Sequence, residues 1–182
     1  MPEDLFRPQL GEPFHYAYAV DDIEATVGRL VEQLGVGPFF LIEKVPLENT
    51  VSRGEPARFV HNSAFGHGSG GTIELMEIID VAPERVERGF SVERPALHHV
   101  GYAVTPEEVG RVRSMLDQRG LPEYLSAQLG ETHNTFHDAS ALLGHDLEVH
   151  VDCQELRDFF GMVRAAAEGW DGGEPLRPVP GA

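Results

Sequence analysis

Apolar and polar residues alternate with a period of two in several short stretches of the chain, which is the pattern of half-buried β-strands. Polar, glycine-bearing stretches separate them, as expected of turns and loops. The pattern therefore predicts a protein rich in short strands. The candidate strands after the first helical segment cover residues 39–45, 57–65 and 72–79, and those after the second cover 123–129, 132–137 and 146–151.

Two further strand-like stretches are copies of each other. Residues 15–20 read HYAYAV and residues 99–104 read HVGYAV, so four of the six positions are identical without a gap. A helical pattern and then three candidate strands follow each copy. The repeat therefore covers a whole β-α-β-β-β unit, and the chain is predicted to be a tandem duplication of it.

The helical segments carry start and stop signals. Apolar residues recur at helical spacing from Ile23 to Leu34, after the candidate caps Asp21 and Asp22 and before Gly35. In the second copy, residues 105–108 (TPEE) predict a capping box with proline at the first helical position, and Gly120 predicts the end.

These signals divide the chain into four predicted parts. Residues 14–80 form the first module and residues 97–152 the second. A C-terminal helix follows over 153–170, with Asp152 and Glu155 as a predicted capping box. The proline- and glycine-rich residues 171–182 are predicted to be a loose tail. The fold class is therefore α+β.

Strand alternation predicts where two histidines point. His15 shares a strand face with Ala17 and Ala19, whereas Tyr16 and Tyr18 share the other face. His99 repeats this arrangement, with Gly101 and Ala103 on its own face. Each histidine thus heads a row of small residues, which leaves volume and suits a cavity better than a filled core.

Two glutamates follow the same logic. Leu147 and Val149 form an apolar row that directs Glu148 to the opposite face of its strand, and apolar neighbours flank Glu74 in the same way. A carboxylate in such a strand needs a partner. Each module is therefore predicted to contribute one histidine from its first strand and one glutamate from its last.

Two imidazoles and two carboxylates would neutralise a divalent ion and suit Ni, Co, Zn, Mn or Fe better than Ca or Mg. We therefore predict one divalent transition metal bound by His15, Glu74, His99 and Glu148. Four protein ligands on an octahedral ion leave two positions for neighbouring oxygens of a small-molecule substrate. The set favours removal of a proton next to a carbonyl, with Glu74 or Glu148 as the catalytic base.

Composition narrows the partners. The 182 residues contain 14 Lys and Arg against 30 Asp and Glu, a formal charge of −16, which opposes binding to nucleic acid or to an anionic membrane. Cys153 is the one cysteine and cannot form an internal disulfide. With no signal-peptide pattern at the N-terminus, we expect a cytoplasmic protein.

The motifs HYAYAVDD from His15, LGVGPF from Leu34, IEL around Glu74, HHVGY from His98 and LEV around Glu148 resemble the vicinal oxygen chelate superfamily. The resemblance is closest to glyoxalase I and methylmalonyl-CoA epimerase. It implies paired βαβββ modules that form a cupped mixed sheet around one metal, the same four ligands, and an isomerase, epimerase or lyase. It also implies a homodimer. The epimerases usually have glutamine at the position of Glu74, and no residues that would bind glutathione or coenzyme A are identified.

Two other functions stay open. His15, His99 and Glu148 alone would form the two-histidine, one-carboxylate triad of an extradiol dioxygenase, although Glu74 would obstruct a position that oxygen needs. Relatives of this fold also sequester small molecules without catalysis.

Several other polar residues have an open role in the sequence. His98 is expected to face away from the ligands, Glu77 to be solvated, and Arg53 and Arg58 to be solvated unless they hold an anionic group. Residues with no assigned role that share or neighbour the ligand face are His133, His137, His150 and Tyr124.

Overall fold

The computed structural model describes residues 10–90 and 93–180. The first half of the chain contains β1 (Pro13–Val20), α1 (Ile23–Leu34), β2 (Phe39–Ile42), β3 (Glu48–Ser52), β4 (Glu55–Pro56), β5 (Arg58–Gly68), β6 (Gly71–Ala82), α2 (Glu84–Glu87) and a 3-10 turn (Arg88–Phe90). The second half contains β7 (Ala96–Val104), α3 (Val109–Gln118), β8 (Glu123–Leu129), β9 (Thr132–His137), α4 (Ser140–Leu143), β10 (Asp146–Val151), α5 (Gln154–Ala167) and β11 (Leu176–Pro178).

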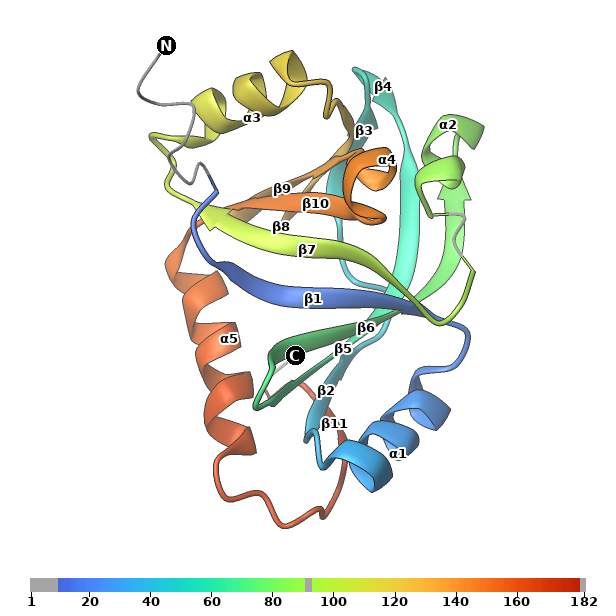
Figure 1. The fold of residues 1–182 in the computed structure, drawn as a ribbon, viewed down its shortest axis with the longest axis vertical. Helices are drawn as coiled ribbons and strands as arrows, with labels where there is room; N and C mark the ends of the chain where they lie inside the picture. Colours follow the sequence, from blue (N-terminus) through green and yellow to red (C-terminus); the bar gives the residue numbers. More distant parts are fainter. Residues whose placement is uncertain (1–9, 91–92, 181–182) are drawn as a thin grey trace.

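The described strands form one mixed sheet in the order β11-β2-β5-β6-β1-β7-β10-β9-β8-β3-β4. The order is nearly symmetric about the central pair β1 and β7, so β2-β5-β6 on one side corresponds to β8-β9-β10 on the other. Figure 1 shows the two central strands crossing the middle of the molecule, with α1 and α3 at opposite ends. The predicted α+β fold is confirmed.

The central pair is antiparallel and sets the spacing of the two predicted histidines. His15 lies opposite Gly101, and Ala17 lies opposite His99. Each histidine therefore faces the small residue that follows the other histidine by two positions. The two imidazoles lie diagonally across the pair, on one face of the sheet.

The last strand of each half lies parallel to its first strand, in the same register in both halves. Ala17 pairs with Glu74 on β6, and Gly101 pairs with Glu148 on β10. The loops between these strands differ in length, yet the glutamates reach equivalent places. The register of the repeat, and not the spacing along the chain, fixes where the glutamates lie.

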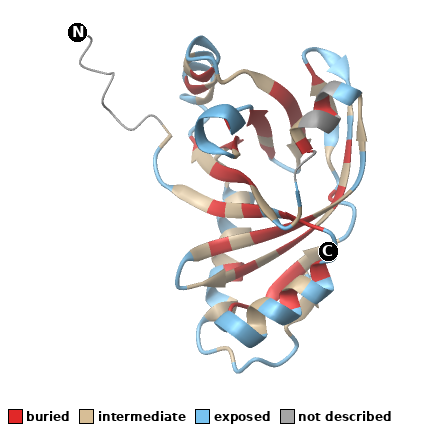
Figure 2. Ribbon diagram, turned by 45° about the vertical axis from the view of Figure 1, so that its right-hand side comes forward, coloured by how far each residue is buried: buried red, intermediate tan, exposed pale blue. Residues whose placement is uncertain are grey.

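Helices α1 and α3 cover the outer face of the sheet. In α1, Asp22 caps the first turn by accepting a hydrogen bond from the Ala25 amide (2.8 Å), and Gly35 ends the helix with a φ of 63°. Val27 is buried on the apolar side of α1 and Val112 on that of α3. Figure 2 shows the buried residues following the strands while the outer helix surfaces are exposed. No helix in the described ranges is long and apolar enough to cross a membrane.

Two capping predictions are wrong. Helix α3 begins only at Val109, because residues 105–108 close a turn in which the Glu108 amide bonds to the Thr105 carbonyl (3.0 Å). The N-cap of α5 is Cys153 rather than Asp152. Glu155 does not close a capping box; its Oε2 accepts a hydrogen bond from the Glu131 amide (2.8 Å), which ties α5 to the β8–β9 turn.

The polar stretch around residues 49–55, expected to be a loop, forms the β3–β4 hairpin. Arg53 and Gly54 have φ values of 52° and 81° at its turn. Strand β3 pairs with β8, so the first half of the chain adds two strands to the edge of the second half. An edge strand exposed to solvent carries little apolar alternation, which is why the sequence pattern predicts a loop.

The end of the chain is also more ordered than the predicted loose tail. Strand β11 pairs in parallel with β2, with Leu176 opposite Phe39. Ahead of it, the ring of Trp170 lies over Gly37, where a Cβ would come within 2.7 Å of the ring. The segment after α5 therefore returns to the first half of the sheet and is attached there.

Candidate metal centre

Four buried side chains from four strands meet near the middle of the sheet. His15 Nε2 lies 3.2 Å from Glu74 Oε2 and 3.3 Å from Glu148 Oε2. His99 Nε2 lies 3.6 Å and 3.1 Å from the same two oxygens. The two Nε2 atoms are 3.2 Å apart, and the four candidate ligand atoms all lie within 4.8 Å of one another.

Gly101 makes this convergence possible. A Cβ at this position would lie 2.1 Å from the imidazole of His15. The ring of His15 therefore occupies the space that any other residue at 101 would fill. The small residue that the sequence pattern places after each histidine has a direct steric role in the second half.

The second oxygen of each carboxylate is held by a neighbouring strand. Ser63 Oγ donates to Glu74 Oε1 (2.6 Å), and Asn134 Nδ2 donates to Glu148 Oε1 (2.7 Å). Ser63 and Asn134 occupy equivalent positions, two residues before Phe65 and Phe136, which pair with the two glutamates. Each glutamate thus has one oxygen fixed and presents the other to the cluster.

His98 fixes the tautomer of His99. The Gly89 carbonyl can only accept, so the His98 Nε2, 2.9 Å away, is the donor, and His98 Nδ1 is left as an acceptor. His99 Nδ1 lies 2.9 Å from His98 Nδ1 and must therefore carry the proton of that hydrogen bond. The Nε2 of His99 is then the atom with a lone pair for a metal ion, an arrangement that metal-binding histidines share.

The prediction that His98 faces away from the ligands is wrong. Ala17 pairs with His99 while Tyr18 pairs with Leu97, so His98 is an extra residue in a β-bulge. A bulge interrupts the alternation of faces. It brings His98 beside His99 and stacks its ring on Phe90, with ring centroids 4.5 Å apart.

His15 has a different environment. Its Nδ1 is buried and has no hydrogen-bond partner among the described residues. Phe14 packs edge-on to its ring at 4.6 Å, and Phe160 of α5 stacks on it at 5.7 Å. On its Nδ1 side, apolar rings rather than a hydrogen bond therefore hold this imidazole.

The charges of the four residues depend on one another. Burial by itself would lower the pKa of His99, but Glu148 and Glu74 outweigh it and raise the pKa to about 10. The pKa of His15 is also raised, because the contacts with the same glutamates exceed the effect of burial. Burial opposes ionisation of both glutamates, yet the imidazoles hold their pKa values well below the usual range. Without a metal ion, protons on the imidazoles balance the carboxylates.

The arrangement fits a divalent transition metal. Ligand atoms about 2.1 Å from a shared ion lie roughly 3.0–3.4 Å from their neighbours in octahedral or tetrahedral geometry. The four nitrogen–oxygen distances of 3.1–3.6 Å are close to this range. The donor set is two imidazole nitrogens and two carboxylate oxygens, which suits such an ion.

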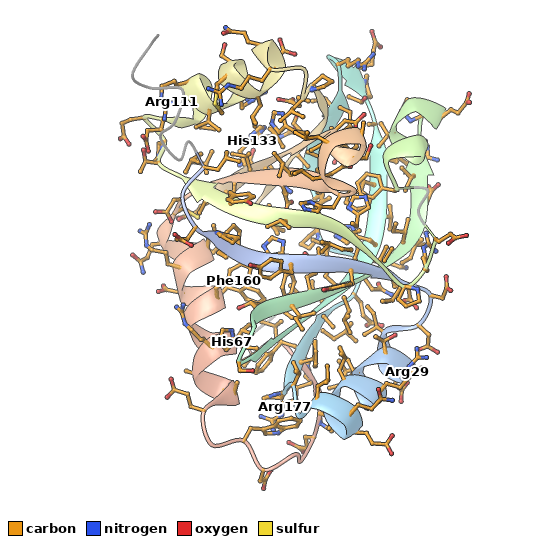
Figure 3. All side chains as sticks on the ribbon, viewed as in Figure 1. Arg29, His67, Arg111, His133, Phe160 and Arg177 are labelled. Carbon is orange, nitrogen blue, oxygen red and sulfur yellow. The ribbon has the colours of Figure 1, made fainter. Side chains whose placement is uncertain are left out.

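A cavity of about 330 Å³ opens over the four residues. Helix α5 forms one wall with Leu156, Phe159 and Phe160, and it packs against β5 and β6. Figure 3 shows Phe160 on the side of α5 that faces the strands. The C-terminal helix therefore covers the candidate site within the same chain.

Of the residues with no role assigned by the sequence, one lines the cavity. His150 does so, and its Nε2 lies 2.8 Å from Glu148 Oε2 but out of line for a hydrogen bond. The residues that do not line it are His133, His137 and Tyr124. His137 bonds to Thr135 and Tyr124 to Asp146, so these two side chains have structural partners.

Three other expected positions lie outside the cavity. Arg58 pairs with Asp80 (2.7 Å) on the protein surface, and Arg53 lies in the β3–β4 turn. Glu77 accepts a hydrogen bond from Asn62 (2.8 Å). Neither arginine is placed to hold a substrate group in the cavity.

Sequence reasoning missed His61, which is buried on β5 and lines the cavity. Its Nδ1 has no partner in the described part of the chain, and burial lowers its pKa to about 4. The signal was present, because His61, Ser63 and Phe65 alternate onto one face of the predicted strand 57–65. The neutral ring adds a polar atom to an otherwise apolar wall.

Comparison with known proteins supports the fold. The sequence model of the Glyoxalase/Bleomycin resistance protein/Dioxygenase superfamily matches residues 14–137. Methylmalonyl-CoA epimerase from Mycobacterium tuberculosis has a similar structure, with a TM-score of 0.53 and 16% sequence identity over 85% of this chain and 96% of that one. The hypothetical protein BH1468 from Bacillus halodurans C-125 has a TM-score of 0.52 and 16% identity over 79% and 95%. No curated protein matches the chain.

Proposed function

Because the chain belongs to the Glyoxalase/Bleomycin resistance protein/Dioxygenase superfamily, we propose that it is a divalent-metal-dependent enzyme that removes a proton next to a carbonyl. Its reaction would be an isomerisation, epimerisation or lyase step on a small oxygenated substrate. The convergence of two buried histidines and two buried glutamates under one cavity carries this proposal.

His15, Glu74, His99 and Glu148 are the proposed ligands of one Ni, Co, Zn, Mn or Fe ion. The bound ion would act as a Lewis acid that polarises a carbonyl oxygen of the substrate. Since the ligands must lose their protons first, binding of the ion releases protons from the imidazoles. One ligand in each half is oriented by a hydrogen bond: Ser63 donates to Glu74, and His99 donates to His98.

The proton acceptor in this proposal is Glu74 or Glu148. Both carboxylates are buried at the base of the cavity, so a carbon atom of a bound substrate can lie close to either. Their burial raises the basicity of whichever carboxylate loses its imidazole contacts. The apolar walls exclude water, which would otherwise compete for the abstracted proton.

The fourth ligand favours this chemistry over the two alternatives. An extradiol dioxygenase needs three open positions on iron. Glu74 Oε2 lies 3.2 Å from His15 and 3.6 Å from His99, close enough to occupy one of them. A non-catalytic binding module has no need of four converging ionisable groups. The homodimer and the cytoplasmic location remain predictions from the sequence.

Elemental analysis of gently purified protein tests the metal site. We expect about one transition-metal ion per chain, and its loss in the His15→Ala and Glu148→Ala variants. His133→Ala is the matched control, because His133 lies outside the cavity. A wild-type protein that takes up none of the five metals would refute the proposal.

Proton exchange in heavy water tests the reaction class without knowledge of the natural product. The metal-loaded protein should exchange the C–H hydrogens next to the carbonyl of a small hydroxyketone, followed by NMR. Replacing the catalytic glutamate by glutamine should slow exchange by roughly 10²–10⁴-fold. Wild-type exchange rates in both Glu74→Gln and Glu148→Gln would exclude the two glutamates as bases.

A further inference from the structure

The residues that line the cavity indicate which kind of substrate fits it. Five phenylalanines line it: Phe59, Phe65, Phe136, Phe159 and Phe160. They come from β5, β9 and α5, so aromatic surface surrounds the space above the four-residue cluster on several sides. The volume of about 330 Å³ is at the small end for cavities that hold organic ligands. A compact molecule with an apolar body fits this space.

The charges of the lining residues also favour an uncharged ligand. Among the described residues that line it, none is a lysine or arginine, and the acidic ones are Glu74, Glu148 and Glu155. The two buried glutamates are balanced by the histidines or by a bound divalent ion, which leaves no positive charge for a substrate anion. Placing a carboxylate or phosphate in such a wall without a partner is costly.

Several buried polar atoms of the cavity-lining residues have no partner among the described residues. His61 Nδ1, Asn134 Oδ1 and His150 Nδ1 are buried, line the cavity through their residues and lack hydrogen bonds within the described chain. Buried polar atoms are normally satisfied, so these three indicate contact with a ligand or with water. A hydroxyl or carbonyl group of a ligand could form hydrogen bonds with them.

Helix α5, which forms one wall of the cavity, is attached to the rest of the protein at both ends. Its start is tied to the second half by Glu155 on the Glu131 amide (2.8 Å) and by Arg157 on Asp152 (2.7 Å). Its end leads through Trp170, packed on Gly37, into β11 on the first half. A helix attached to the sheet at both ends keeps the apolar wall that it forms in place over the four residues.

We infer that the substrate is an uncharged, compact molecule whose aromatic or branched apolar body carries two adjacent oxygens, as in an α-hydroxyketone. The inference rests on the proposed function for the two oxygens and on the cavity walls for the absence of charge. It separates this chain from enzymes that act on coenzyme A thioesters, although a similar structure carries the name methylmalonyl-CoA epimerase.

Two probes of almost equal size test the inference on the metal-loaded protein. 2-Hydroxyacetophenone is neutral, whereas mandelate has a carboxylate on the same aromatic skeleton. A divalent ion in water prefers the carboxylate, so a protein that reverses this order does so through its cavity. Calorimetry should show 2-hydroxyacetophenone binding at least tenfold more tightly than mandelate. Equal or tighter binding of mandelate, or no binding of either probe, would overturn the inference.

Methylmalonyl-CoA is the third probe. At concentrations at which 2-hydroxyacetophenone saturates the protein, it should neither bind nor displace that ligand. Competitive binding of methylmalonyl-CoA would overturn the inference. Metal content is measured on the same samples, so a protein without metal contradicts the proposed function, whereas a metal-loaded protein that prefers anions contradicts only the substrate class.

A charge introduced into the cavity gives a second test. Leu156→Arg puts a cation on the wall formed by α5, and it should shift the preference toward mandelate by at least tenfold. Ala165→Arg adds the same charge to an exposed position of the same helix and should leave the preference unchanged. An unchanged preference in a folded, metal-loaded Leu156→Arg protein would argue against the inference, and the wild-type comparison decides the matter if this variant does not fold.

Discussion

The two halves of the molecule place the same pair of residues in the same register but support them differently. In the second half, His99 has a hydrogen bond from its Nδ1 to His98. The residue equivalent to His98 in the first half is Phe14, and His15 Nδ1 has no partner in the described structure. The bulge that brings His98 beside His99 is thus a feature of one half only.

The neighbours of the two glutamates also differ, being polar in the second half and apolar in the first. Glu148 has His150 at 2.8 Å, whereas the residue equivalent to His150 beside Glu74 is Met76. Beyond the hydrogen bonds from Ser63 and Asn134, which the halves share, the second half has the polar neighbours His98 and His150, whereas the first has Phe14 and Met76 at the equivalent positions. A duplicated fold can therefore keep equivalent ligands in both halves while the residues around them become polar in one half and apolar in the other.

The substitution with the largest expected effect on the metal centre lies in the central strand pair, β1 and β7. Gly101→Ala puts a Cβ into the imidazole of His15, so we expect a loss of about 1–3 kcal/mol in the free energy of unfolding and at least a 100-fold weaker metal affinity. Ala17→Gly, at the equivalent place in the first half, should cost only about 0.5–1 kcal/mol and leave affinity nearly unchanged. Thermal unfolding and metal titration measure both, and equal effects of the two substitutions would contradict the steric role of Gly101.

Removing the hydrogen bond between His99 and His98 is expected to weaken metal binding to a smaller extent. His98→Phe keeps the ring against Phe90 but removes the acceptor for His99 Nδ1, so metal affinity should fall roughly 10–100-fold. His98→Asn restores an acceptor and should recover part of the loss. Phe14→Leu is the control in the first half and should change affinity little. Wild-type affinity in His98→Phe would show that the tautomer of His99 needs no such support.

The hydrogen bonds to Oε1 of the two glutamates are equivalent in the two halves, so removing either one should have the same effect on metal affinity. Ser63→Ala and Asn134→Ala each remove one donor to an ionised carboxylate, worth about 1.5–3 kcal/mol in the folded protein. We expect similar losses of metal affinity, of roughly tenfold, from both. A large loss in only one variant, measured by competition with a chelating dye, would mean that the halves differ in this support as well.

The stability of the metal-free protein is also expected to depend on pH. The pKa of His99 rises from 6.5 to about 10 on folding, so its contribution is fully present below pH 6.5 and is lost as pH rises toward 10. The melting temperature of the metal-free protein should therefore fall across this window. The His99→Gln variant should show a smaller fall, and an equal slope in both proteins would contradict this origin.

The sequence predicted the repeat, the fold class and the four residues that meet at the centre, because alternation in strands and duplication are strong local signals. Alternation alone could not predict the bulge at His98, since one inserted residue reverses the faces beyond it. The β3–β4 hairpin and β11 were missed because edge strands exposed to solvent have weak apolar patterns. His61 was missed because it has no counterpart in the second half, where Thr132 occupies the equivalent position.

The contact between Trp170 and Gly37 has a practical consequence. Trp170 is the single tryptophan of the chain, and it lies between the end of the covering helix and the first half of the sheet. Its fluorescence should therefore report detachment of the C-terminal segment separately from the loss of strand structure seen by circular dichroism. The chain thus contains its own optical signal for the opening of the cavity.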